Sequence, residues 1–375
     1  MKQGWEIKKL GEIICEHSVR NKQDYDYPVY SVTNSAGFCR DYFSKEVASK
    51  DKKTYKIVPK GYFAYNPSRI NVGSVDWQRH EDNVIVSPLY VVFGTDDTIC
   101  QDYLLYYLKS SSTMALIQNH ATGTVRANLK FDILSQFAIS LPPIAEQKKI
   151  VYELDCISGI IEKKKQQLKE LDNLAQSIFY EMFGDPVEND NGWEVKRLDE
   201  IGEIIAGSTP STADDTNWDG DINWVTPAEL DVQLYYGETV RKITEKAAKS
   251  LTLMPVGTVL LSTRAPIGKI AITTVPMYCN QGFKNIICNE CINNVFLYYY
   301  LMLTMDNIKA LGRGATFKEV SKKNISEYKV IIPDLDKQKQ FASKIESIEK
   351  QKELIAQSIK ETETLFNSRM DYYFN

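Results

Sequence analysis

The chain has 375 residues, 43% of them hydrophobic and 25% charged, with a formal net charge of −4. This length allows two domains of ordinary size, each with its own core. The acidic balance argues against a protein that coats nucleic acid without regard to sequence, although it allows local basic patches. No apolar run approaches the ~20 residues that a membrane span needs, and the first residues lack the apolar core of a signal peptide. We therefore expect a cytoplasmic protein that does not enter a membrane.

The opening segment of the chain occurs twice. The sequence GWEIKKL at 4–10 returns as GWEVKRL at 192–198. A second pair of segments, 141–150 and 332–341, begins with an aliphatic residue and a proline and continues into charged residues. The two offsets, about 188 and about 191 residues, are nearly equal, which indicates a duplication.

A turn followed by a strand is predicted at the same place in each copy, over 61–65 and over 257–261. An arginine and then a glycine follow each predicted strand: Arg69, Gly73, Arg264 and Gly268.

The later part of each copy also shows one order of elements. Amphipathic helices are predicted over 103–108 and 295–301. A loop with a glycine follows each helix, and then comes a strand that ends at proline: Gly123 and 137–141, Gly314 and 328–332. Mixed strands and helices in both copies indicate an α+β fold with two globular domains.

A heptad pattern closes each copy. Apolar residues recur at alternating steps of four and three, which is the seam of a coiled coil. The seam residues are Ile150, Leu154, Ile157, Ile161, Leu168 and Leu171, then Phe341, Ile345, Ile348, Ile355 and Ile359. The first seam also includes Lys164 and continues through Ala175, Ile178 and Met182. Each helix is predicted to span ~40 residues, or ~60 Å at 1.5 Å per residue.

The predicted organisation has four parts: a globular domain over 1–143, a helix over 144–186, a globular domain over 187–333 and a helix over 334–375. A seam needs a partner, and the nearest one is the helix of the other copy. We predict an antiparallel intramolecular coiled coil that separates the two domains and relates them by a pseudo-two-fold axis. In the alternative, each helix packs only on its own domain. Polar seam positions in the second helix keep that alternative open: Lys352, Thr362 and Arg369.

Motifs of catalysis or cofactor binding are not found. The sequence has no phosphate-binding G-x-x-x-x-G-K-[ST] loop, no G-x-S-x-G elbow and no H-E-x-x-H. Asn66-Pro67 is followed by Ser68-Arg69, and not by the second proline and aromatic residue of the amino methyltransferase signature. We interpret it as a turn, and we expect no cofactor.

The seven cysteines are scattered and odd in number, which argues against a disulfide framework. Cys288 and Cys291 form a single C-x-x-C pair near Cys279. No second pair or histidine follows at zinc-ligand spacing. We predict reduced thiols and no metal site.

The ordered, duplicated set of segments resembles the specificity subunit of Type I restriction–modification systems. That family has two target recognition domains, each followed by a long helical spacer, and the likeness extends over essentially the whole chain. The Gly-Trp starts at Gly4 and Gly192 are typical of where a recognition domain begins. The segment PPIAEQ at 142–147 is typical of where a spacer begins. The second copy departs from that closing pattern at Asp334 and Lys337 and keeps Gln338.

The resemblance implies a non-catalytic subunit that reads double-stranded DNA at two half-sites, one for each domain. Because the domains differ in sequence, the implied target is bipartite and asymmetric. The implied partners are two methyltransferase subunits and two restriction (translocase) subunits, which carry the catalytic activities. The alternatives are a coiled-coil scaffold with two globular heads and no DNA role, and an enzyme whose site the sequence does not reveal.

Base edges are read by side chains that donate or accept hydrogen bonds, and phosphates are contacted by cations and small polar groups. The candidate residues of the first domain are Ser31, Thr33, Asn34, Asn66, Ser68, Arg69 and Arg126. Those of the second are Ser208, Thr209, Thr212, Thr226, Arg264, Asn280, Gln281, Arg313 and Lys318. Arg69 and Arg264 occupy corresponding places, which favours a shared contact. The alternative for each residue is a solvated loop or a hydrogen bond that stabilises the fold.

Overall fold

The computed structural model describes residues 5–40, 52–120, 128–231, 233–312 and 319–375. The chain divides into two compact units. Unit 1 consists of Met1–Lys165 with Gln357–Asn375, and unit 2 of Gln166–Ala356. Each unit therefore combines a globular segment with part of both long helices. The boundaries of the units fall within the long helices, whereas the organisation predicted from the sequence treats each helix as one part.

Unit 1 is built on a four-stranded antiparallel sheet in the order β2-β9-β6-β7. These strands are β2 (Ile14–Glu16), β9 (Val91–Thr95), β6 (Phe63–Tyr65) and β7 (Val75–Trp77). Two small antiparallel strand pairs accompany it: β3 (Ser31–Thr33) with β4 (Gly37–Cys39), and β5 (Lys56–Pro59) with β8 (Asn83–Val86). The helices are α1 (Gln101–Lys109), α2 (Ser111–His120) and α3 (Phe131–Leu134).

Unit 2 has a central sheet of the same order with one strand added, β12-β19-β16-β17-β14. Its strands are β12 (Gly202–Ala206), β19 (Lys284–Cys288), β16 (Val259–Leu261), β17 (Ile270–Thr273) and β14 (Tyr235–Tyr236). A second sheet contains β15 (Lys242–Ile243), β13 (Trp218–Val225) and β18 (Tyr278–Cys279). The helices are α5 (Leu198–Ile201), α6 (Glu245–Ala248), α7 (Asn294–Leu303), α8 (Met305–Ala310) and α9 (Lys322–Ser326).

The duplicated edges of the sequence form the same antiparallel pair in each unit. In unit 1, β1 (Glu6–Lys9) pairs with β10 (Ala138–Leu141), and in unit 2, β11 (Glu194–Arg197) pairs with β20 (Lys329–Ile332). Pairing the start of a domain with its last strand closes the domain just before its long helix. Both units thus have the mixed strand-and-helix character that the duplication predicts.

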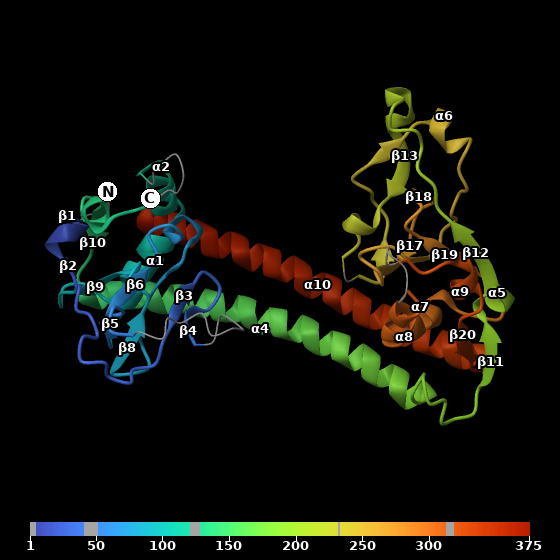
Figure 1. The fold of residues 1–375 in the computed structure, drawn as a ribbon, viewed down its shortest axis with the longest axis horizontal. Coiled ribbons are helices and arrows are strands. Elements are labelled where there is room, and N and C mark those ends of the chain that lie inside the picture. The colour runs from blue at the N-terminus through green and yellow to red at the C-terminus, as the bar shows by residue number, and fades with distance from the viewer. Residues whose placement is uncertain (1–4, 41–51, 121–127, 232, 313–318) are drawn as a thin grey trace. The chain divides into compact units, whose positions relative to one another are not determined.

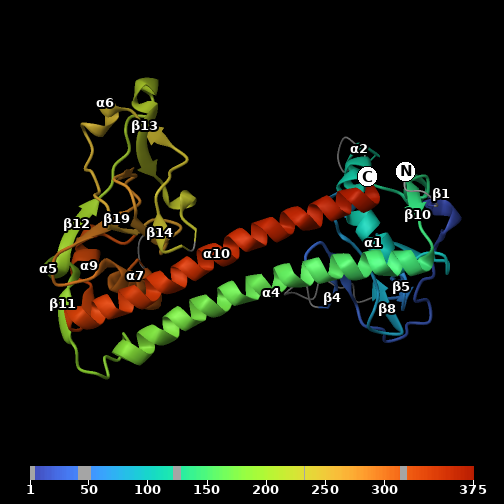
Figure 2. The same cartoon turned by 180° about the vertical axis from the view of Figure 1, so that it is seen from behind.

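The two long helices are α4 (Ile144–Phe183) and α10 (Leu335–Phe374), each of 40 residues. Within unit 1 the beginning of α4 runs beside the end of α10, and within unit 2 the end of α4 runs beside the beginning of α10 (Figures 1 and 2). Met370 of α10 lies in the core of unit 1, and Phe183 of α4 lies in the core of unit 2. The alternative in which each helix packs only on its own domain is therefore wrong.

Most predicted seam residues are shielded from solvent. The buried ones are Ile150, Leu154, Ile157, Ile161, Phe341, Ile345, Ile348 and Ile359, and the half-buried ones are Leu168, Leu171 and Ile355. Toward the end of α4 the fully buried residues are Phe179 and Phe183, whereas the heptad pattern gave Ile178 and Met182. The reason is that this end packs on aromatic side chains of its unit, with Phe179 stacked on Phe296 at 5.5 Å between ring centroids.

The polar seam positions have partners within their units. The Lys164 ammonium donates to the hydroxyls of Ser358 at 2.7 Å and Thr362 at 2.8 Å. Lys352 pairs with Asp172 and Glu349, each at 2.8 Å. Burial alone would lower the pKa of Lys352, but its hydrogen bonds to those two carboxylates outweigh burial and raise it. Arg369 pairs with Glu153. Paired cations of this kind are compatible with a helix interface.

All seven cysteines are free thiols. Burial raises the pKa of Cys279 and of Cys288 to about 12, so both thiols are protonated at neutral pH and neither is a ready metal ligand. Within the described ranges, no three His, Cys, Asp or Glu side chains gather in an arrangement suited to a metal ion. Among those same residues, no helix is both long enough and apolar enough for a membrane span.

Candidate nucleic-acid interface

The turn after the third strand of each central sheet makes the same contact in both units. In unit 1 the Leu129 backbone N–H donates to the Pro67 carbonyl at 3.1 Å. In unit 2 the Val320 N–H donates to the Thr263 carbonyl at 2.9 Å. Leu129 and Val320 are fully buried, so each fixes the chain against the turn that carries the candidate arginine.

Three candidate cations lie outside the described residues: Arg126, Arg313 and Lys318. The loop glycines at 123 and 314 do so as well. Leu129 and Val320 lie close after these candidates along the chain, three residues after Arg126 and two after Lys318.

Asn66, Ser68 and Arg69 form a turn directly after β6, as predicted for the Asn66-Pro67 step. The Asn66 side-chain oxygen accepts from the Ser68 N–H at 3.1 Å and from the Ser68 hydroxyl at 2.9 Å. The Asn66 carbonyl accepts from the Arg69 N–H at 2.9 Å. Arg69 itself is exposed. Asn66 and Ser68 thus shape the turn, and Arg69 is the side chain of the three that is open to a ligand.

Asn34 meets this turn through Gly73. The Asn34 side-chain oxygen lies 2.6 Å from the place that a Cβ on Gly73 would occupy. Gly73 has φ of +83°, a conformation that glycine adopts readily, and the N–H of the next residue, Ser74, donates to the Arg69 carbonyl at 3.2 Å. The structure therefore brings Asn34 and the Arg69 turn together.

Ser31 and Thr33 belong to the strand β3. Thr33 is buried, and its hydroxyl oxygen accepts from the Ala36 N–H at 3.0 Å, which closes the β3–β4 turn. The Ser31 carbonyl accepts from the Cys39 thiol at 3.7 Å across the strand pair. The observed hydrogen bond of Thr33 stabilises the fold, which is the alternative stated for each candidate residue.

In unit 2 the loop at 207–209 packs on the turn at 280–282. The Ser208 N–H donates to the Cys279 carbonyl at 2.9 Å, and the Thr209 hydroxyl donates to the Gln281 side chain. A Cβ on Gly207 would stand 2.0 Å from the Asn280 carbonyl oxygen, so only glycine allows this approach. Polar groups from two distant segments are thereby gathered in one place.

Arg264 joins the same cluster. The Thr263 N–H donates to the Gly282 carbonyl at 2.8 Å, which holds the arginine turn against the 280–282 turn. The Arg264 Nε donates to Glu319 at 2.9 Å, and the Lys284 ammonium lies 3.5 Å from the other oxygen of that carboxylate. Sequence reasoning missed Lys284 and Glu319, because they lie 35 positions apart and no local spacing links them.

Thr226 and Thr212 are placed differently. The Thr226 hydroxyl and N–H both donate to Glu229, at 2.9 and 3.0 Å, and so cap the short 3-10 helix Pro227–Glu229. Thr212 is exposed, and the carbonyl of its neighbour Ser211 accepts from the Trp218 indole at 3.2 Å. Thr226 has a structural hydrogen bond, and Thr212 belongs to the surface beside β13.

Two arginines that the sequence did not single out lie on aromatic rings. In unit 2, Arg241 lies over Trp218 at 4.1 Å and near Trp224 at 5.0 Å. In unit 1, Arg79 lies over Trp77 at 4.2 Å. Burial would lower the pKa of Arg79, but hydrogen bonds to Asp76 and Asp102 outweigh burial and raise it. Arg79 is thus held by the carboxylates of Asp76 and Asp102, whereas the Arg241 guanidinium stacks on two indole rings.

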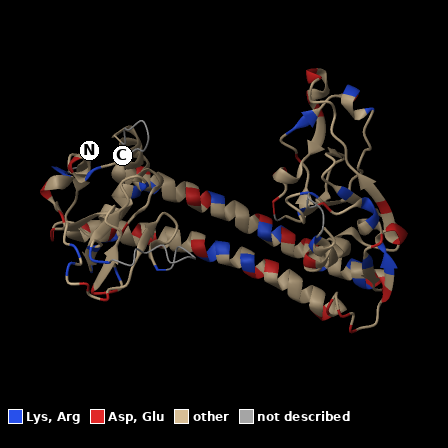
Figure 3. Cartoon of the chain, in the orientation of Figure 1, with Lys and Arg blue, Asp and Glu red and all other residues tan. Residues whose placement is uncertain are grey.

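Charges of both signs alternate along the long helices (Figure 3). This pattern agrees with the net charge of −4 and argues against a continuous basic track along either helix. Two candidate cations that the structure describes lie instead at turns, Arg69 after β6 and Arg264 after β16.

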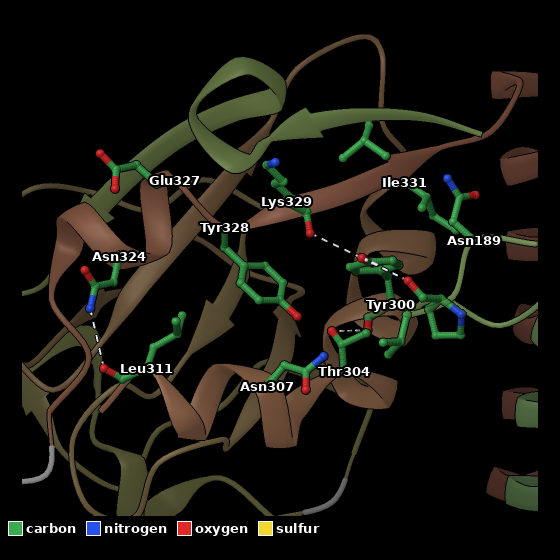
Figure 4. Close-up of a pocket in the computed structure, with 13 residues that line it drawn as sticks. Asn189, Tyr300, Thr304, Asn307, Leu311, Asn324, Glu327, Tyr328, Lys329 and Ile331 are labelled. Carbon is green, nitrogen blue, oxygen red and sulfur yellow. Dashed lines mark hydrogen bonds between the residues drawn. The ribbon is translucent and has the colours of Figure 1, made fainter. Parts of the chain in front are cut away.

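Unit 2 also has a groove of about 540 Å³ (Figure 4). Its walls come from the connector at Pro186–Asn189, from β20 and from α8 and α9. Tyr300 closes one side, where its hydroxyl is within 3.2 Å of the Lys329 carbonyl and 3.3 Å of the Pro186 carbonyl. Burial raises the pKa of Tyr300, so the group stays a neutral donor. Of the predicted DNA-binding residues that the structure describes, none lines this groove.

Comparison with known proteins gives one consistent family. The family model of the Type I restriction modification DNA specificity domain matches the chain twice, over residues 2–173 and 190–364. The MjaIX specificity subunit of Methanocaldococcus jannaschii is 37% identical over 49% of this chain and 43% of that protein. The putative MjaX specificity subunit of the same organism is 23% identical over 92% of this chain and 87% of that protein. The HindI specificity subunit of Haemophilus influenzae is 21% identical over 92% of this chain and 93% of that protein.

Solved structures show the same fold. A chain from a structural study of complex assembly and conformational transition in a type I R-M system superposes with a TM-score of 0.63, at 20% identity over 100% of this chain and 98% of that one. The S subunit of the Type I restriction-modification system from M. genitalium gives a TM-score of 0.59, at 14% identity over 99% of this chain and 96% of that one.

Proposed function

The chain belongs to the Type I restriction modification DNA specificity family, and from this membership we propose that it reads a bipartite, asymmetric DNA target, with one half-site for each unit. It is the sequence-specific recognition subunit of such a complex. The partner subunits carry out catalysis, and this chain recognises the DNA sequence at which they act. The double family match supports two readers in one chain, and the different middles of the two units support two different half-sites.

The repeated turn is the observation that carries the proposal. Both units fix an arginine-bearing turn, at Arg69 and at Arg264, against a buried residue, Leu129 or Val320. Around each turn lie side chains with amide groups, Asn34 in unit 1 and Gln281 in unit 2. Guanidinium groups bond phosphates and guanine edges, and amides bond adenine edges. A repeated cluster of these groups suits one half-site in each unit.

The long helices would set the distance between the half-sites. We propose that α4 and α10 form an antiparallel intramolecular coiled coil that relates the units by a pseudo-two-fold axis. Support comes from the contacts inside each unit, where Lys164 meets Thr362 and Lys352 meets Asp172. In such an arrangement the half-sites keep a constant spacing, because a paired helix is stiff along its axis.

The proposed partners are double-stranded DNA, two methyltransferase subunits and two restriction (translocase) subunits. They follow from the family and from a structural neighbour studied for complex assembly of a type I R-M system. A scaffold without a DNA role is the weaker reading, because the family match covers both globular segments and not the helices alone.

Methylome sequencing of a host with and without this gene tests the proposal. The expected result is one methylated motif that has two unlike halves separated by unread bases and that disappears when the gene is removed. A methylome that does not change on deletion would show that the chain does not direct methylation.

Substitution of Arg264 tests the repeated turn. Arg264→Ala should weaken binding of the full chain to its target duplex by about 1–3 kcal/mol if the guanidinium contacts a base, or reduce the salt slope by about 1 if it contacts a phosphate. Arg197→Ala is the matched control, since Arg197, the last residue of β11, is exposed and paired with Asp199. Equal affinities and slopes for the two variants would remove Arg264 from the interface.

A further inference from the structure

Glu319 forms ion pairs with two cations of unit 2, Arg264 and Lys284, that could otherwise bind a DNA phosphate. Its two carboxylate oxygens are divided between Arg264, at 2.9 Å, and Lys284, at 3.5 Å. The three side chains come from three segments: the turn after β16, the first residue of β19, and the described residue that follows 313–318. Backbone pairing of Arg264 with Glu319 fixes their separation.

The two cations differ in how far their side chains are exposed to solvent. The Lys284 side chain is only 9% exposed, whereas that of Arg264 is 46% exposed. A buried ammonium without a counter-charge is costly, and the other acceptor that Lys284 has is the Gln281 carbonyl at 3.4 Å. Lys284 therefore holds an anion at this place, and Arg264 presents the open side of the same anion site.

A carboxylate and a DNA phosphodiester are close chemical equivalents here. Each carries one negative charge and offers oxygens to a guanidinium and an ammonium. Resting on the proposed function, we propose that Glu319 stands in for a DNA phosphate in the free subunit and gives up the Arg264–Lys284 site when DNA binds. Glu319 is thus a specificity-determining residue that works by competition.

The competition acts mainly against wrong sequences. A DNA phosphate gains nothing in charge by replacing Glu319, since one anion replaces another at the two cations. The affinity for DNA then depends on contacts between the bases and neighbouring side chains such as Gln281 and Asn280. Only a duplex of the cognate sequence allows these contacts. Non-specific binding, which rests on phosphate charge and counterion release, is reduced.

Unit 1 has other residues at the positions that correspond to Glu319 and Lys284. Leu129 and Val320 make corresponding contacts, so Asn128 takes the place of Glu319. The strands β9 and β19 also correspond, so Val91 takes the place of Lys284. The exposed Arg69 meets neither a carboxylate nor a second cation at these positions. The inference therefore concerns unit 2, and it predicts that the two half-sites respond differently to salt.

Glu319→Gln in the full chain is the test, with a ~30-base-pair duplex pool of random sequence as the probe. The variant should bind the pool up to about fivefold more tightly, and its plot of log affinity against log salt should steepen by about 0.9, the value of one further phosphate contact. Glu290→Gln is the matched control, because Glu290 is an exposed carboxylate of the same unit and its loss changes net charge equally. Fluorescence anisotropy at several salt concentrations measures both quantities.

The gain should vanish when Arg264→Ala is combined with Glu319→Gln, because the released cation is then absent. A gain that persists in that double variant, equal slopes for Glu319→Gln and Glu290→Gln, or weaker binding by Glu319→Gln would each overturn the inference and leave the proposed function intact. Failure of the wild type and every variant to bind DNA at the lowest salt would overturn both. If Glu319→Gln does not fold, Lys284→Met with Glu319→Gln removes the buried cation as well. That pair should still bind the pool more tightly than the wild type, and equal or weaker binding would overturn the inference.

Discussion

Unit 1 and unit 2 share the order of their central sheets, the pairing of their first and last strands and the packing of a helix end on the domain. They differ in the strands and loops added to that frame. Unit 2 carries the sheet of β13, β15 and β18 and the anion site of Arg264 and Lys284, where unit 1 has two small strand pairs. The comparison teaches that the frame is duplicated while the proposed reading surface is free to diverge.

The ends of the long helices offer the largest test of the shared frame. Phe183 ends α4 and Phe374 ends α10. Phe183 packs on Phe296 of α7 at 4.9 Å, and Phe374 packs on Tyr103 of α1 at 5.1 Å. Phe183→Ala should lower the free energy of unfolding by about 3–5 kcal/mol, because Phe183 is fully buried and a cavity remains. Phe374→Ala should cost less, because that side chain is half-buried.

Urea unfolding of the two variants measures these costs. The exposed Tyr372→Ala on the same helix end is the control for the loss of a ring. A loss for Phe183→Ala no greater than for Tyr372→Ala would contradict the packing described for unit 2.

A buried glutamine at each helix start gives the next largest effect. Gln147 and Gln338 are both fully buried. Gln147 accepts from the Cys100 N–H at 2.8 Å and donates to the Pro142 carbonyl at 2.8 Å, and Gln338 makes the same two bonds to Asn293 and Pro333. Each side chain therefore ties the long helix to the start of α1 or α7.

Replacing either glutamine by alanine should cost about 1–3 kcal/mol, because buried backbone groups lose their partners. Thermal and urea unfolding check this, with the exposed Gln340→Ala as control. A marked difference between Gln147→Ala and Gln338→Ala would break the correspondence of the two units at the very point where their sequences agree.

Polar seam positions should give the smallest effects. Lys352→Met removes the partner of two carboxylates, and because the pair is partly exposed we expect a loss of about 1 kcal/mol. Lys164→Met removes only hydrogen bonds to Ser358 and Thr362, and methionine fills a similar volume, so a change within about 0.5 kcal/mol is expected. Denaturant midpoints compare them, and a larger loss at Lys164 than at Lys352 would reverse the assigned roles.

The sequence predicted the frame well because local signals define it. Gly-Trp starts, prolines before long helices and heptad spacing are all read within a few residues of one another. The buried glutamines also lie in those segments. The turn at Asn66 was predicted from a single dipeptide, and its side-chain hydrogen bonds agree with that interpretation.

The interface could be predicted only in part, because its contacts join distant segments. Nothing near Lys284 in the sequence indicates that Glu319 neutralises it. By contrast, the hydroxyls of Thr33 and Thr226 bond groups only three residues away, and the T-x-x-E spacing of Thr226 and Glu229 is a local signal of a helix cap. The heptad rule likewise missed Phe179, because that part of α4 packs on a domain and not on a helix alone. Periodicity identifies a face, and tertiary contacts decide which residues of that face are buried.

The measurement that most directly tests two independent readers is methylome sequencing of a host in which residues 202–326 of unit 2 are exchanged for the corresponding segment of another family member. The expected motif keeps one half and the gap length of the original and replaces the other half. A motif changed in both halves, or an unchanged motif, would contradict the assignment of one half-site to each unit.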